Sequence, residues 1–125
     1  MIYHDSVTVV LQVPYDPPQY SEFGEPLYDH TIQTVPAEVF PLDTDAVVDV
    51  VAHVVTSRYR MILAPNMDIP PRIGDNLRLG WGAFPLDPDD PFGYNSGLLV
   101  DGTIERHTLR GRLHHYELIT KSVLA

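Results

Sequence analysis

The sequence predicts a small all-β domain, a β-barrel or sandwich of about six strands with two long inserted loops. Twelve prolines and eight glycines divide the 125 residues into short segments, a spacing that favours strands and loops over long helices. Residues 6–13 alternate as a half-buried strand does, with Val7, Val9 and Leu11 on one face. Apolar residues make up 44% of the chain. That fraction allows one hydrophobic core, and the length suits one domain spanning 1–125.

The first inserted loop follows this strand directly. Residues 14–30, called the arm below, are rich in proline and tyrosine and fit neither a regular strand nor a helix for long. Residues 30–40 are expected to form the next strand, in which Pro36 implies an edge position or a bulge.

The rest of the chain reads as short strands around a second loop. A strand is predicted from about 50 to 63. The valines before it also match helical spacing, but their β-branched side chains favour a strand. Residues 76–81 form a short strand, residues 82–97 are the acidic loop, and the closing strands are 98–107 and 113–123, with Gly111 in the turn between them.

Charge is distributed unevenly along the chain. The net charge is −9, and residues 1–57 contain nine acidic residues and no Lys or Arg. All eight basic residues lie at Arg58 or beyond, where the other eight acids balance them. A protein that grips DNA needs clustered Lys and Arg, so nucleic-acid binding through a basic patch is not expected.

Composition also limits the chemistry. With no cysteine, the chain has no disulfide, thiolate metal site or cysteine nucleophile. There is no Gly-x-Ser-x-Gly elbow and no phosphate-binding glycine loop, and Asp87-Pro-Asp-Asp lacks the ligand spacing of a calcium loop. Neither a secretory signal nor a membrane-spanning segment is apparent, so the protein is expected in the cytoplasm or in a particle assembled there, with no membrane partner. We expect no enzyme activity.

The six histidines raise the question of a metal site. On a regular strand, His114 and His115 point to opposite faces and cannot bind one ion together. His107 and one of this pair could meet across the last hairpin, with Glu117 or Glu105 adding an oxygen. An N/O site needs converging ligands, which the sequence does not demonstrate. The simpler interpretation is half-buried cross-strand packing, so no catalytic residue, metal or cofactor is predicted.

Aromatic side chains concentrate in the two long segments. Such residues often anchor protein interfaces, and two long aromatic loops are difficult to bury on so small a domain. We therefore expect contacts with partners at Tyr15, Tyr20, Phe23 and Tyr28 of the arm and at Phe84, Phe92 and Tyr94 of the acidic loop.

The second half of the chain, roughly residues 56–120, resembles the head-to-tail stopper (head-closure) proteins of siphophages, particularly those of actinobacteria. The resemblance rests on an ordered set of segments. These are Thr56-Ser-Arg-Tyr-Arg-Met-Ile-Leu-Ala-Pro, Ile73-Gly-Asp-Asn-Leu-Arg-Leu-Gly-Trp, Val100-Asp-Gly and Arg110-Gly-Arg-Leu-His-His-Tyr-Glu.

This resemblance implies a β-barrel whose copies form a ring in the virion neck. The ring would contact the portal and its adaptor on one side and the tail terminator or tail tube on the other, closing a channel through which DNA passes without sequence-specific binding. Acidic walls would suit that channel, because cations bound at the wall would form contacts with the DNA phosphates and slow its passage. Channel or inter-ring contacts are expected from the aromatics above and from Asp87, Asp89 and Asp90. Subunit-interface charges are expected at Arg58, Arg60, Arg72 and Arg78.

Three other interpretations remain open. The nearest is a tail terminator or another ring protein of the same junction. A metal-dependent β-barrel enzyme would use His107, His114 or His115 together with Glu117. A host binding module would use the aromatic loops on a peptide or sugar.

Overall fold

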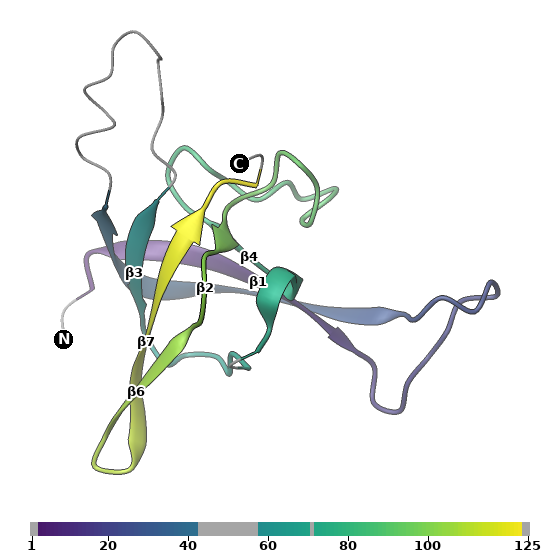
Figure 1. The fold of residues 1–125 in the computed structure, drawn as a ribbon, viewed down its shortest axis with the longest axis horizontal. Coiled ribbons are helices and arrows are strands. Elements are labelled where there is room, and N and C mark those ends of the chain that lie inside the picture. The colour runs from purple at the N-terminus through teal and green to yellow at the C-terminus, as the bar shows by residue number, and fades with distance from the viewer. Residues whose placement is uncertain (1–2, 43–57, 71, 124–125) are drawn as a thin grey trace, which may run out of the picture.

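The computed structural model describes residues 3–42, 58–70 and 72–123, and these fold into one antiparallel β-structure (Figure 1). Its strands are β1 (Asp5–Pro14), β2 (Tyr28–Pro41), β3 (Tyr59–Leu63), β4 (Leu77–Gly80), β5 (Leu99–Val100), β6 (Glu105–Leu109) and β7 (Arg112–Lys121). Six of them form a nearly closed barrel, in the order β4-β1-β2-β3-β7-β5, and β6 pairs with β7 beside it. The predicted fold class, a small all-β barrel, is confirmed.

The barrel closes where β4 meets the start of β5. Leu79 and Leu98 form an antiparallel bridge, donating their backbone N–H groups to each other's carbonyls at 3.0 and 2.7 Å. Closing a sheet in this way satisfies edge groups that would otherwise stay open.

Alternation along the strands creates the core. In β1, Val7, Val9 and Leu11 point inward, as predicted, and in β7 Tyr116 and Leu118 do the same. Side chains from other strands join the cluster, among them Val35, Ala37, Met61, Leu63, Leu77 and Leu79. Burying apolar surface on this scale is the main source of stability for the barrel.

β1 and β2 form a long hairpin that extends far beyond the barrel. Their pairing runs without a break from Asp5–Ala37 to Pro14–Tyr28. The predicted position of Pro36 on an edge or at a bulge is wrong, because β2 lies between β1 and β3. Pro36 is tolerated there since pairing with β3 ends at Ala37, so its missing N–H interrupts no ladder on that side.

Two other strand predictions need correction. Residues 98–107 are not one strand: Gly102, at φ +89°, lies in a break between β5 and β6. The strand predicted for 50–63 appears as β3, while its part before residue 58 lies outside the described residues.

Helical structure in the described part of the chain is limited to one short turn. In the described ranges this is the 3₁₀ turn η2 (Gly74–Asn76), where the sequence placed a Gly-Asp turn. Across the same ranges we find no helix with the length and apolar character needed to cross a bilayer.

Candidate functional site

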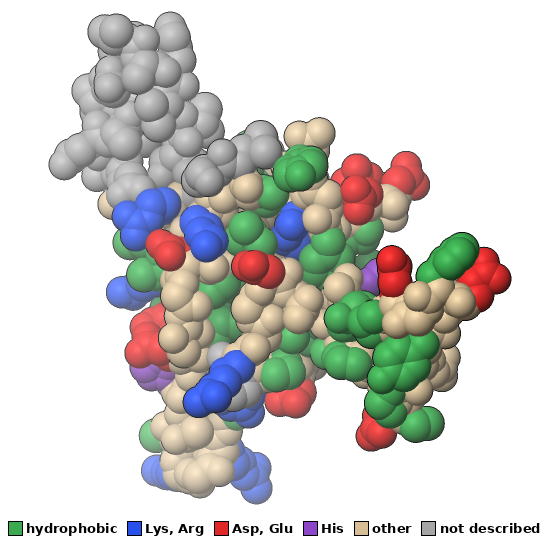
Figure 2. All heavy atoms as spheres, turned by 45° about the vertical axis from the view of Figure 1, so that its right-hand side comes forward, with side chains coloured by type: hydrophobic (Ala, Val, Ile, Leu, Met, Phe, Trp, Pro, Cys, Tyr) green, Lys and Arg blue, Asp and Glu red, His purple; other side chains and the backbone are tan. Residues whose placement is uncertain are grey.

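The arm projects from the barrel as an exposed extension of the β1–β2 hairpin (Figure 1). Phe23 is 83% exposed and Tyr20 62%, and Tyr15 and Tyr28 are also exposed. Apolar and acidic side chains share this surface (Figure 2). The aromatic side chains of the arm are therefore exposed, and no contact with the barrel covers Phe23. Their predicted contact with partners stays a prediction.

The tip of the arm is an ordered turn. The hydroxyl of Ser21 accepts hydrogen bonds from the backbone N–H groups of Phe23 and Glu25, both at 3.2 Å. Gly24 adopts φ +80° and donates to the Ser21 carbonyl at 3.0 Å. These bonds hold Phe23 outward without support from the barrel.

The acidic loop, in contrast, folds back onto its own domain. Arg78 of β4 is 8% exposed, and its guanidinium donates to the carbonyls of Gly93, Ser96 and Phe92 at 2.7, 2.9 and 2.9 Å. The Asp87 N–H donates to the buried Ser96 hydroxyl at 2.9 Å. Contact of Arg78 with a neighbouring subunit was a wrong prediction, because this side chain instead anchors the loop.

The aromatic residues of the acidic loop divide into two groups. Phe84 packs with Trp81 around Tyr59, with ring centroids 6.2 and 4.9 Å from the Tyr59 ring. Phe84 is thus half-buried against the core of its own domain, and its predicted contact with a partner stays a prediction. Phe92 is half-buried against Arg78, while Tyr94 remains 79% exposed.

The remaining predicted charges lie at the surface. Asp89 and Asp90 are exposed and Asp87 is half-buried. Arg58 reaches Asp101 at 3.7 Å, Arg60 lies over the Phe40 ring at 5.3 Å, and Arg72 is exposed. Their predicted role between subunits stays a prediction.

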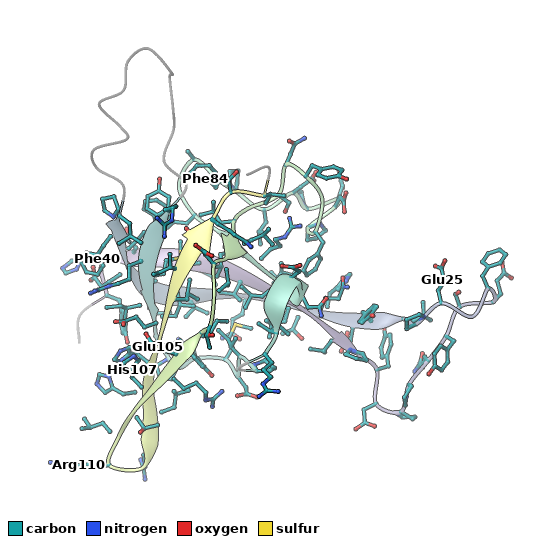
Figure 3. The ribbon with its side chains drawn as sticks, viewed as in Figure 1. Glu25, Phe40, Phe84, Glu105, His107 and Arg110 are labelled. Carbon is teal, nitrogen blue, oxygen red and sulfur yellow. The ribbon has the colours of Figure 1, made fainter. Side chains whose placement is uncertain are left out.

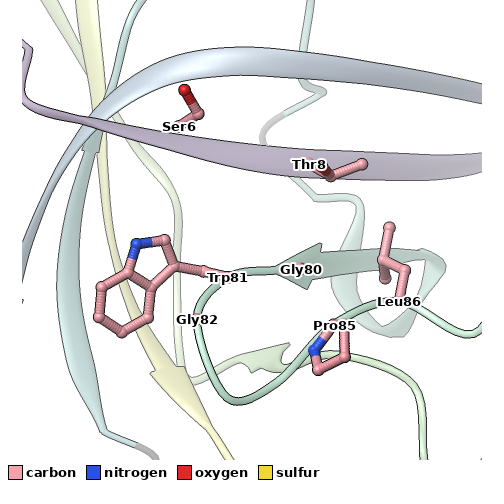
Figure 4. Close-up of a pocket in the computed structure, with 7 residues that line it drawn as sticks. All are labelled: Ser6, Thr8, Gly80, Trp81, Gly82, Pro85 and Leu86. Carbon is pink, nitrogen blue, oxygen red and sulfur yellow. The ribbon is translucent and has the colours of Figure 1, made fainter.

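A hollow of about 410 Å³ lies between β1 and the start of the acidic loop (Figure 4). Its lining consists of Ser6, Thr8, Gly80, Trp81, Gly82, Pro85 and Leu86. None of these side chains can act as an acid, a base or a strong metal ligand at neutral pH, so the hollow does not resemble a catalytic site.

The β6–β7 hairpin brings together a second group of polar side chains, called the hairpin cluster below: His107, His114, His115 and Glu117 (Figure 3 labels His107 and the neighbouring Glu105). Ligand atoms of His107, His115 and Glu117 lie within 4.8 Å of one another. The structure therefore brings together three residues that the sequence analysis named as possible metal ligands.

A β-bulge explains why both histidines of the pair take part. His107 pairs with His115 while Thr108 pairs with Leu113, so His114 is the extra residue in β7. The Nδ1 atoms of His114 and His115 lie 2.9 Å apart. The expectation that they point to opposite faces is wrong, because alternation fails at a bulge. No sequence signal marked this bulge.

The surroundings of His115 favour its neutral form. Burial lowers the pKa of His115, nearby His107 and His114 lower it further, and Glu117 acts in the opposite direction. A contact between two Nδ1 atoms also requires that one of them lacks a proton. A neutral imidazole can accept a hydrogen bond or bind a metal ion.

Comparisons with known proteins extend the fold assignment only. The fold is similar to the solution structure of a Shigella flexneri 2a protein, a structural-genomics target, with a TM-score of 0.53 and 15% identity. That similarity covers 97% of this chain and 93% of the other. No protein-family model matches the sequence, and no curated protein matches it.

Proposed function

We propose that the chain is a structural subunit of the head-to-tail connector of a tailed bacteriophage, where copies form a stopper ring between the portal adaptor and the tail. The observation that carries this proposal is the arm, an ordered hairpin whose Phe23 and Tyr20 side chains lie largely exposed. An isolated subunit gains nothing from such an extension, whereas a neighbour in a ring can cover it. The segment resemblance to siphophage stoppers supports the same assignment.

The charge of the arm agrees with a position near DNA. Its acidic residues, Asp16, Glu22, Glu25 and Asp29, are all exposed, and residues 1–57 carry no Lys or Arg. A negative surface repels the phosphate backbone and so leaves DNA free to pass. We assign the arm to the lumen or the ring interface. The acidic loop is a weaker candidate for a gate, since Arg78 fixes it to the barrel.

Phage particles produced by a strain that encodes the chain provide the test. Mass spectrometry of purified, tailed particles should detect the chain, and a cryo-EM map of the neck should place it in a ring next to the portal adaptor. A place at the tail end of the neck would instead indicate the tail terminator. Absence of the chain from complete particles would overturn the proposal.

A complementation experiment tests the arm itself. In a strain deleted for the gene, the wild-type chain should restore tailed particles and Phe23→Ser should not. Leu109→Ser is a matched control, because Leu109 is 59% exposed but lies at the tip of the β6–β7 hairpin. Equal complementation by both variants would exclude the arm as the contact that matters.

A further inference from the structure

We propose that His107, His115 and Glu117 form a binding site for a transition-metal dication of the Zn²⁺ type, with His114 as a positioning residue. The proposal is independent of the connector function. Two imidazole nitrogens and one carboxylate oxygen are a donor set that suits Zn²⁺ and disfavours Mg²⁺ and Ca²⁺, which prefer oxygen ligands.

Strand register determines the positions of these three ligands. His115 and Glu117 are two residues apart on β7, so they share a face, and Tyr116 between them points into the core. His107 lies directly across on β6, opposite His115. All three ligands therefore project from the outer face of one hairpin, and each is half-buried.

One buried nitrogen of the cluster lacks a hydrogen-bond partner among the described residues. The Nε2 atom of His107 is inaccessible to solvent and makes no hydrogen bond within the described residues. The carboxylates of Glu117 and Glu105 lie 3.8 and 3.9 Å from it, beyond hydrogen-bonding distance. A buried nitrogen without a partner costs stability, and a metal ion would satisfy it.

Only small side-chain movements separate this arrangement from a coordinated ion. Two nitrogen ligands of a tetrahedral zinc ion lie about 3.3 Å apart, so the present spread of 4.8 Å has to contract modestly. The His107 and His115 rings are stacked, with centroids 4.6 Å apart and planes at 6°, and they must splay for both lone pairs to converge. β6 pairs only with β7 among the described strands, so β6 and its His107 can adjust without disturbing the six strands of the barrel.

His114 can orient His115 from behind. When the Nδ1–H of His115 donates to the Nδ1 of His114, the Nε2 of His115 carries a free lone pair. Second partners of this kind fix the ring that binds the metal. Glu105 and Glu117 also line an open hollow of about 340 Å³, so a water molecule or Glu105 can reach the remaining coordination position.

The test is a zinc titration of the full chain, without an affinity tag and after removal of metal with a chelator. We expect one Zn²⁺ per chain and a rise in Tm with free zinc, since a ligand bound only by the folded state stabilises it. Zinc should shift the ring ¹⁵N resonances of His107 and His115. Mg²⁺ should produce neither effect. If zinc shifted the ring ¹⁵N resonances of other histidines only, the proposal would be overturned.

Variants separate ligands from the positioning residue. His115→Ala and Glu117→Gln should each weaken zinc binding by more than tenfold. Glu117→Gln keeps the size of the side chain, so it still tests the site if His115→Ala folds poorly. His30→Ala is the matched control, because His30 lies on the arm and contacts Gln12 instead. His114→Ala should weaken binding by roughly tenfold or more, and His114→Asn, which retains a polar atom near Nδ1, should restore part of it. Unchanged affinity in Glu117→Gln and His115→Ala would disprove the site.

Discussion

The carbonyl of Leu79 lies 2.6 Å from the position that a Cβ atom on Gly97 would occupy, in the same segment where Leu79 and Leu98 exchange backbone hydrogen bonds. Gly97 itself adopts φ +61°. The closure of the barrel thus depends on a glycine for two separate reasons, a left-handed backbone and a close approach between β4 and the end of the acidic loop.

Gly97→Ala should therefore open or strain this closure. The left-handed conformation costs about 1–2 kcal/mol for a residue with a Cβ, and the clash with the Leu79 carbonyl adds to that cost. Gly82→Ala is the control, since Gly82 has φ +56° but nothing within 4 Å of its Cβ position. Denaturant unfolding should show a clearly larger loss of unfolding free energy for Gly97→Ala than for Gly82→Ala. Equal losses in the two variants would show that the close approach to Leu79 is unimportant.

Arg78→Met should release the acidic loop from the barrel. The variant leaves three loop carbonyls without their charged donor, and we expect the free energy of unfolding to fall by about 2–4 kcal/mol. Arg72→Met removes an exposed arginine and should change stability by less than about 0.5 kcal/mol. Hydrogen exchange should accelerate at residues 92–97 in Arg78→Met alone. Unchanged protection there would show that the loop is held by other contacts.

Tyr116→Phe should destabilise the barrel end at which residues 64–70 leave β3. The Tyr116 hydroxyl accepts from the Ile69 N–H at 3.0 Å and donates to the Met67 carbonyl at 3.1 Å. Its removal leaves a buried N–H without an acceptor, at a cost of about 1–3 kcal/mol. Tyr20→Phe on the exposed arm should be close to neutral in the same thermal unfolding experiment. A neutral Tyr116→Phe would imply that water replaces the hydroxyl.

Where inward-facing apolar residues alternate along a strand, the sequence was sufficient. The alternation of Val7, Val9 and Leu11 correctly predicted β1 and its inward face. The exposed arm was also predictable, because its prolines prevent a buried strand and its aromatics have no nearby core. Both inferences depend only on local pattern.

Features that depend on another segment were not predictable. The position of Arg78 on a strand indicates its face, but only the fold of the acidic loop shows that this face is covered. Likewise, the two-residue turn at Arg110 and Gly111, both with positive φ, would place His107 opposite His114 in a regular hairpin. The bulge shifts His115 into that position, and it is set by backbone geometry rather than by residue type.

Stability at alkaline pH should depend on Tyr59, whose ring is buried between Trp81 and Phe84. Burial raises the pKa of Tyr59 above its ordinary value near 10, as it does the pKa of Tyr3. Above pH 10 the unfolded chain then loses a proton that the folded chain retains, so folding stability is complete below that pH and falls as pH rises through the folded-state pKa. In an absorbance titration, Tyr59→Phe should show one late-ionising tyrosine fewer than the wild type. The stability of Tyr59→Phe should also fall less steeply above pH 10, and an identical slope would mean that Tyr59 ionises as freely in the folded protein as in the unfolded chain.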